Sequence, residues 1–249
     1  MPAMRIGLLT DIHANREALD AVLAAAAADR VDRFVLLGDL VGYGPDPEYV
    51  VERCARLVED GAVCIKGNHD EAAIVSTYPM SENARVAMDW TRRRLGADHA
   101  RFLAALPMEK SEDDRLYVHA SAEKPEKWLY VNSIAAAATC LAATPARYVF
   151  CGHTHKPAHF FSLGGRTPSV FVPIANTALP LSPIRRSVTV VGAVGQPRDG
   201  NAAACYGLLD LGERCITMRR VPYDSETTLS KIKAADLPAW LGMRLQVGR

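Results

Sequence analysis

The feature that most constrains the fold is a repeated pattern of short apolar runs that each stop at a cluster of polar residues. Residues 5–10, 33–37 and 62–65 form such runs, and helical segments at 16–28 and 48–60 separate them. Apolar strands that alternate with helices favour parallel pairing through right-handed crossovers. Because ligands bind beyond the carboxyl ends of the strands in an open α/β sheet, we expect the polar clusters to converge there.

The remainder of the chain extends this pattern and then departs from it. Residues 71–105 are predicted to form two or three helical pieces, and runs at 115–118 and 147–151 resume the strand pattern on either side of a helix at 133–143. Short runs separated by turn residues then predict an antiparallel second sheet. Its strands are expected at 158–163, 169–173, 187–191, 203–211 and 215–221, before a helix at 224–235 and a polar tail. The pattern favours a single α/β domain over residues 1–249.

Composition narrows the class of protein. Hydrophobic residues make up 49% of the 249 and charged residues 23%, which is typical of a globular protein with a sizeable core. The net charge of +1 provides no long-range field that would draw nucleic acid or a membrane to the surface. No apolar run approaches the roughly 18 residues of a membrane-spanning helix, and the N-terminus does not resemble a signal peptide, so a cytoplasmic location is expected. The six cysteines lack C-x-x-C spacing and are expected to be buried thiols.

The placement of histidine indicates chemistry at the converging strand ends. Five of the seven histidines lie in the polar clusters, whereas His99 is expected on an exposed helix and His159 as a packed side chain of a strand. The clusters supply nitrogen and oxygen donors of the kind that divalent transition metals prefer. These donors belong to Asp11, His13, Asp39, Asn68, His69, His119, His153 and His155.

Spacing within the clusters suggests how metals would be held. In the pairs Asp11-x-His13 and His153-x-His155 the two side chains would project the same way from an extended loop, so that one cation could be gripped by both. Asp39 is the candidate for a carboxylate that bridges two cations about 3.5–4 Å apart. The glycines that precede Asp39 and His153 would allow backbone turns that a Cβ atom would hinder.

In chain order, the motifs D-x-H, GD, GNHD, H and GHTH resemble those of the calcineurin-like metallophosphoesterase superfamily over residues 5–221, and residues 195–200 are similar to a segment of its small bacterial members. The resemblance implies an αββα sandwich, in which helices flank two stacked mixed β-sheets. It also implies two divalent metal ions, with manganese, iron, zinc, nickel and cobalt all open. It assigns Asp11, His13 and His155 to one metal, Asn68, His119 and His153 to the other, and Asp39 to both.

The resemblance further implies a mechanism in which a water held by both metals attacks phosphorus without a covalent phosphoenzyme. His69 is left over as the non-ligand, and its implied role is to donate a proton to the leaving alkoxide or to hold the phosphoryl group. An adjacent acid, Asp70 or Asp11, could orient it. These assignments favour metal-dependent hydrolysis of phosphodiester or phosphomonoester bonds in a small, nucleotide-type substrate.

Loop residues near the predicted site supply candidate substrate contacts. Tyr43, and Trp128 with the nearby Tyr130, are expected over the pocket, where an aromatic ring could stack on a base or aryl group. Serine/threonine protein phosphatases of the superfamily carry an arginine soon after the GD motif, and its absence from residues 38–44 disfavours that class. The basic residues best placed to meet a phosphate are Arg185, Arg186 and Arg198.

Two other classes of function remain open. One is a non-catalytic metal-binding scaffold of the same fold, against which the complete set of presumed ligands argues. The other is a nuclease acting on short single strands, disfavoured by the near-zero net charge and the lack of a capping domain. The expected partner is therefore a small phosphorylated molecule, with no membrane or nucleic acid. The oligomeric state is open, because residues 82–105 and the edge of the second sheet are both candidate interfaces.

Overall fold

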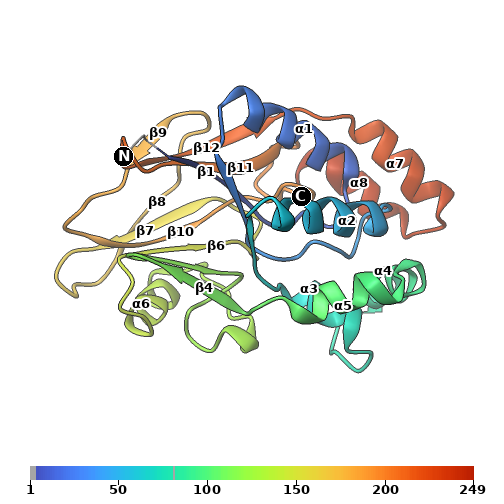
Figure 1. The fold of residues 1–249 in the computed structure, drawn as a ribbon, viewed down its shortest axis with the longest axis horizontal. Helices are drawn as coiled ribbons and strands as arrows, with labels where there is room; N and C mark the ends of the chain where they lie inside the picture. The colour runs from blue at the N-terminus through green and yellow to red at the C-terminus, as the bar shows by residue number, and fades with distance from the viewer. Residues whose placement is uncertain (1–3, 81) are drawn as a thin grey trace.

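The computed structural model describes residues 4–80 and 82–249, which form two mixed β-sheets packed face to face with helices outside them (Figure 1). The first sheet has the strand order β3 (Val63–Cys64), β2 (Arg33–Leu36), β1 (Arg5–Leu9), β11 (Ala204–Asp210), β12 (Cys215–Val221) and β9 (Ala178–Pro180). The second has the order β4 (Glu109–Glu112), β5 (Arg115–Val118), β6 (Tyr148–Cys151), β10 (Arg186–Val190), β7 (Ala158–Ser162) and β8 (Ser169–Phe171). The predicted αββα architecture is confirmed.

The alternation of side chains along the strands builds the layers. In β1, Ile6 and Leu8 pack into the core between the sheets, together with Tyr117 and Phe150 of the second sheet, whereas Leu9 packs outward beneath the helices. Successive side chains of a strand point to opposite faces, so one strand contributes both to the inner core between the sheets and to the outer core beneath the helices. The inner core thereby fixes how the two sheets, and the loops at their ends, lie against each other.

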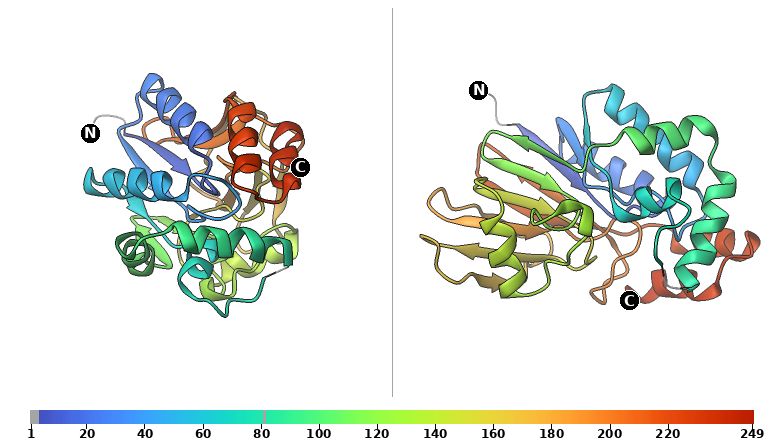
Figure 2. Two further views of the ribbon diagram at one scale, coloured as in Figure 1. Left: turned by 90° about the vertical axis from the view of Figure 1, so that its right-hand side faces the viewer. Right: turned by 90° about the horizontal axis from the view of Figure 1, so that it is seen from below.

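Helices cover the outer faces and one end of the sandwich. The first sheet is covered by α1 (Arg16–Ala28) and α2 (Pro47–Glu59), and the second by α6 (Ile134–Ala142). Beside them, α7 (Ser225–Ala234) packs on α1, and α8 (Ala239–Val247) packs on α7. The group α3 (Asn68–Ile74), α4 (Glu82–Arg94) and α5 (Ala97–Ala105) packs beside α2 (Figure 2), and a single 3-10 turn covers Pro125–Lys127. Asn15 begins α1 by accepting the Ala18 N–H, and Ser133 begins α6 by accepting the Ala136 N–H.

The assignment of strands to sheets differs from the prediction in one respect. The later strands do not form a separate antiparallel sheet, because β11 pairs with β1 and β10 pairs in parallel with β6. As a result β5 and β6 lie in the second sheet instead of continuing the first. Apolar runs specify which faces of a strand are buried, but the choice of neighbouring strand is made by tertiary packing.

Three elements were missed because their sequences are atypical. The edge strand β4 is entirely charged and polar, and β9 has only three residues. The segment predicted as a polar tail contains α8, whose Gly242 packs against α7: a Cβ there would lie 2.2 Å from Leu229 Cδ1. Glycine disfavours a helix on propensity alone, so this helix depends on its packing.

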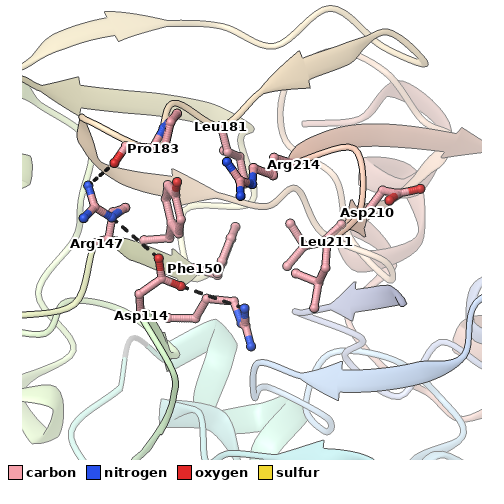
Figure 3. A pocket seen from close by; sticks show the side chains of 11 residues that line it. Asp114, Arg147, Phe150, Leu181, Pro183, Asp210, Leu211 and Arg214 are labelled. Atoms are coloured by element: carbon pink, nitrogen blue, oxygen red, sulfur yellow. Dashed lines mark hydrogen bonds and ion pairs between the residues drawn. The ribbon is translucent and has the colours of Figure 1, made fainter. Parts of the chain in front are cut away.

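All six cysteines are free, and only Cys215 is not fully buried, as the spacing predicted. Within residues 4–80 and 82–249, no helix combines the length and hydrophobicity needed to cross a membrane. A cavity of about 290 Å³ opens between the sheets at the start of β5 and β6 (Figure 3). Asp114 lies 3.6 Å from Arg147 and 3.9 Å from Arg115 in its wall, so these charges are already paired. This end of the sheets is opposite to the one that carries the histidines.

Candidate metal centre

The predicted polar clusters do converge, at the end of the sandwich where β1, β2, β5 and β6 finish. Backbone hydrogen bonds join the loops: the Asp11 N–H donates to the Gly38 carbonyl at 3.0 Å, and the Gly195 N–H donates to the Asp11 carbonyl at 2.9 Å. The side chains brought together are those of Asp11, His13, Asp39, Asn68, His69, His119, His153 and His155. Segments far apart in the chain therefore supply one site.

The ligand-bearing loops adopt an unusual backbone conformation. Five candidate ligands have φ between 48° and 67°: Asp11, His13, Asp39, His153 and His155. The prediction that the D-x-H and H-x-H pairs lie in extended loops is therefore wrong. A left-handed conformation of a non-glycine residue typically costs about 1–3 kcal/mol and is concentrated at functional sites. The fold holds these residues in place against that local cost.

The first donor group consists of Asp11, His13 and His155. Asp11 Oδ1 lies 3.2 Å from His155 Nε2 and 3.7 Å from His13 Nε2, and the two Nε2 atoms are 3.2 Å apart. Donors bound at about 2.1 Å to one cation lie roughly 3.0–3.4 Å from each other. Two of the three separations fall in this range and the 3.7 Å separation lies just above it, so the group is close to the spacing of ligands around a single divalent cation.

The second donor group consists of Asp39, Asn68, His119 and His153. His119 Nε2 lies 3.3 Å from Asp39 Oδ2, 3.3 Å from Asn68 Oδ1 and 3.2 Å from His153 Nδ1. The same Asp39 oxygen is 3.7 Å from His13 Nε2 in the first group. One carboxylate oxygen thus stands between the two groups, as a bridging ligand must.

Backbone carbonyls fix the orientation of three histidine rings. In each case the ring Nδ1 contacts a main-chain carbonyl oxygen. The distance is 3.1 Å from His13 to Val41, 2.7 Å from His119 to Leu37 and 2.6 Å from His155 to Gln196. Since a carbonyl only accepts, each Nδ1 carries a proton and each Nε2 faces the centre, where it can bind a cation once it holds no proton of its own. Metal-binding histidines are commonly held in this way.

The centre needs positive charge. Asp11 Oδ1 is buried without a hydrogen-bond partner among the described residues, and it faces the converging histidine nitrogens. Burial lowers the pKa of His119, but the adjacent Asp39 carboxylate outweighs burial and raises this pKa to about 9. An unpaired buried carboxylate oxygen and converging histidine nitrogens, of which His119 Nε2 would give up its proton, are what a pair of divalent cations would satisfy. The residues present fit such a pair.

His69 lies beside the donor groups. Its ring centroid is 4.8 Å from that of His13, and its Nδ1 is buried without a hydrogen-bond partner among the described residues. Ring and carboxylate atoms of His13, Asp39 and His69 lie within 4.8 Å of one another. His69 therefore faces the same space as the candidate ligands.

Asp70 does not orient His69, contrary to one sequence-based hypothesis. Its Oδ2 accepts the backbone N–H groups of residues 39 and 67, both at 2.9 Å, and its Oδ1 accepts those of residues 40 and 41, at 2.9 and 3.3 Å. Asp11, the other candidate, binds the Thr10 hydroxyl and the His153 N–H through its Oδ2. Asp70 instead ties the loop after β2 to the start of α3 and so positions Asp39.

Glycines permit close packing of these loops. Gly38 has φ +87° and makes the predicted turn before Asp39. At Gly152 the reason is different, because a Cβ would lie 1.9 Å from Thr10 Oγ1. A Cβ at Gly67 would lie 2.2 Å from the Asp39 nitrogen. Contact between neighbouring motifs thus requires glycine in each of them.

Aromatic side chains line one side of the centre. The Tyr130 ring stacks on His153 with centroids 4.1 Å apart, and the Trp128 ring lies 5.9 Å from that of His119. Tyr130 is 52% exposed, whereas Trp128 is buried. The structure thus brings Trp128 to the site as predicted and shows that Tyr130 presents the open face.

Tyr43 and one arginine lie on the other side. The Tyr43 ring is 4.7 Å from His13. Arg198 donates its backbone N–H to the His155 carbonyl at 3.2 Å, and its guanidinium lies 5.8 Å from the Tyr43 ring. The predictions for Arg185 and Arg186 are wrong. Both lie at the start of β10, the end of the sheet away from the ligands: Arg185 lies over the Phe161 ring, and Arg186 donates to the carbonyls of Thr144 and Ala146 just before β6.

The two remaining histidines are structural. His99 is half-buried, and its Nδ1 accepts the Gly96 N–H at 3.1 Å, so it caps the start of α5 instead of being a free surface side chain. His159 is buried in β7, with its Nδ1 2.9 Å from Thr189 Oγ1, as the prediction of a packed side chain required.

Two donor groups joined by one aspartate, at the strand ends of an αββα sandwich, define a protein of the dinuclear metallohydrolase class. The family model described as the calcineurin-like phosphoesterase superfamily domain matches residues 4–214, and the chain belongs to this superfamily. Proteins of this superfamily are hydrolases that act on phosphate esters.

Similar proteins match along nearly their whole length. An uncharacterized protein of Methanocaldococcus jannaschii is 30% identical over 256 residues, covering 98% of each chain. The crystal structure of a metallophosphoesterase from Sphaerobacter thermophilus is 36% identical, with a TM-score of 0.87 over 99% of this chain and 100% of that one. A hypothetical protein from Pyrococcus horikoshii shares the fold, with a TM-score of 0.79 and 18% identity over 99% of both chains.

Proposed function

We propose that this chain is a dinuclear metal-dependent phosphoesterase acting on a small phosphorylated molecule of nucleotide type. The observation that carries the proposal is the position of Asp39 Oδ2, between His119 Nε2 at 3.3 Å and His13 Nε2 at 3.7 Å, with both Nε2 atoms turned inward. Asp11, His13 and His155 would hold one cation, Asn68, His119 and His153 would hold the other, and Asp39 would bind both.

Cations bound there would supply positive charge against the phosphoryl oxygens and lower the pKa of the water that attacks phosphorus. The residues of the chain provide position and proton transfer. Main-chain carbonyls keep the histidine rings aimed at the centre, which removes the need to reorganise during the reaction. His69, whose Nδ1 has no partner among the described residues, would donate to the leaving oxygen or to the phosphoryl group.

The open face of Tyr130 supports a substrate with a planar group. One face of its ring stacks on His153 at a centroid distance of 4.1 Å, with the two planes inclined by only 18°. A base or aryl group laid on this ring would sit next to the second donor group, gaining about 0.5–1.5 kcal/mol beyond burial from stacking. Nucleotide-type phosphate esters meet this requirement.

The test compares hydrolysis of bis-p-nitrophenyl phosphate and p-nitrophenyl phosphate by protein stripped with a chelator and reloaded with manganese. The His155→Gln variant removes one proposed ligand, and His99→Gln, outside the centre, is the matched control. We expect metal-dependent hydrolysis by the wild type and the control, with loss of metal and of hydrolysis in His155→Gln. A faster diester reaction would indicate a phosphodiesterase, and a faster monoester reaction a phosphatase. Metal binding without cleavage of either ester would overturn the proposal in favour of a scaffold.

A further inference from the structure

Beside the first donor group, two arginines lie over the neighbouring rings of Tyr43 and Trp240, and among the described residues neither pairs with an aspartate or glutamate. Arg198 is fixed next to the centre by its backbone hydrogen bond to the His155 carbonyl, and its guanidinium donates to the neutral Gln196 Oε1 at 2.8 Å. Arg244 comes from α8, the helix that the sequence pattern did not predict. Among residues 4–80 and 82–249, neither side chain forms a salt bridge with an aspartate or glutamate, and the Arg244 Nε donates to the main-chain oxygen of Arg249.

The helix α8 is positioned to serve the site. Leu241 and Leu245 of α8 pack in one cluster with Ala87 of α4 and with Tyr43, and in Figure 2 (left) the C-terminal helices, drawn in red, lie beside the loop that follows β2. The Tyr43 and Trp240 rings are 6.4 Å apart. Tyr43 therefore contacts both the candidate ligands and the C-terminal helix.

Each of the two guanidinium groups lies over an aromatic ring. Arg198 Cζ lies 5.8 Å from the Tyr43 ring centroid, and Arg244 Cζ lies 5.1 Å from the Trp240 ring centroid. Partial burial and, next, the charge of Arg198 lower the pKa of Arg244, so the two cations act on each other. Arg244 lies in the last turn of α8, where the helix dipole favours a positive charge. The dipole does not explain why the charge of Arg198 lies nearby.

We propose that Arg198 and Arg244 form a subsite for a second anionic group of the substrate, such as the additional phosphate of a nucleoside diphosphate or a dinucleoside polyphosphate. The inference rests on the proposed function, because it places the reacting phosphoryl group at the metal centre. Guanidinium groups bind phosphate through charge-assisted, often bidentate, hydrogen bonds. The subsite lies on the Tyr43 side of the centre and the open face of Tyr130 on the other, so the substrate would extend across the centre between them.

The subsite would favour substrates with a second anionic group, because that group relieves the repulsion between the two arginine charges. Two half-buried cations that pair with no aspartate or glutamate disfavour each other, and an anion bound by both offsets this repulsion. A ligand with one phosphoryl group would be held at the metal centre alone. A ligand with two would gain the arginine contacts as well, which predicts a preference that depends on both side chains.

The experiment measures binding of two phosphonates that cannot be hydrolysed, methylphosphonate and methylenediphosphonate, to the full chain loaded with manganese, by calorimetric titration. The quantity of interest is the ratio of their dissociation constants. In Arg198→Gln and in Arg244→Gln the preference for the diphosphonate should fall by about tenfold, the loss expected for one charged hydrogen bond. Arg244→Lys should retain part of it, because the charge is kept. Arg101→Gln, an exposed arginine on α5, is the control and should match the wild type.

An unchanged ratio in both glutamine variants would overturn the inference, as would failure of the diphosphonate to bind. The titration does not depend on turnover. A chain that keeps the arginine-dependent preference but hydrolyses neither nitrophenyl ester would therefore refute the proposed function and leave the subsite supported. A chain that hydrolyses an ester but shows no arginine-dependent preference would refute the subsite alone.

Discussion

The Asp70→Asn substitution tests how the site is positioned, because one carboxylate holds together two loops that carry ligands. The substitution keeps the shape of the side chain but replaces one oxygen with an amide NH₂ group. Whichever way the amide turns, two backbone N–H groups lose their acceptor and face a donor, either those of residues 39 and 67 or those of residues 40 and 41. Hydrogen bonds to charged groups are worth roughly 1.5–3 kcal/mol each. The expected loss is therefore about 3–6 kcal/mol in the free energy of unfolding.

Urea unfolding of chelator-treated protein, followed by circular dichroism, measures this loss without the contribution of bound metal. Burial and the negative charge of Asp39 raise the pKa of Asp70 to about 7, so the measurement belongs near pH 8.5, where the carboxyl group is ionised. Asp98→Asn is the control, since this exposed residue pairs only with Arg101 on the surface and should change stability by less than about 0.5 kcal/mol. A loss below about 1 kcal/mol for Asp70→Asn would refute the positioning role.

Three further predictions concern the centre and its surroundings. His69→Asn should lower turnover about a hundredfold or more while metal content, measured by elemental analysis, stays at the wild-type level, and full turnover on an ester with a poor leaving group would exclude a proton-donor role. Chelation should lower the thermal midpoint of the wild type but not of Asp39→Asn, because a metal that binds only the folded state stabilises it, and equal shifts in the two proteins would contradict the bridging role. Burial lowers the pKa of His159 to about 4 from 6.5, so the unfolded chain takes up the proton first and stability should fall as pH drops from 6.5 to 4. The fall should amount to about 3 kcal/mol relative to His159→Gln, and parallel stability curves of the two proteins would refute it.

Local sequence predicted the strand ends and the convergence of the polar clusters well, because both depend on patterns within a few residues. The run before Asp11 and the run before His153 are apolar on both faces, so their lengths mark where each strand must end. Polar side chains at those ends have no place in the core and must face the site. The two donor groups of the structure contain the residues that the resemblance assigned to each metal.

Local sequence did not predict which strands pair with each other, or the roles of residues such as Asp70 that hold the candidate ligands in place. Whether β10 pairs with β6 or with the first sheet depends on packing between distant segments, which no local pattern encodes. The role of Asp70 became visible only when its carboxylate was seen to accept N–H groups from the loop that carries Asp39. The third position of α3 was the available signal, since an acidic residue there commonly accepts the N–H at the start of the helix.

The left-handed loops explain why the same residue types serve both chemistry and fold. Aspartate and histidine adopt positive φ several-fold more readily than most non-glycine residues, and here Asp11, Asp39 and His153 do so while presenting a donor atom. Replacing one of them by a β-branched residue would remove a ligand and also impose a conformation that the new side chain resists. The carboxylate of Asp70 and the glycines between the motifs offset this cost from outside the donor groups. The geometry of the centre therefore depends on residues that bind no metal, and this is where substitutions should change metal affinity without changing the ligands.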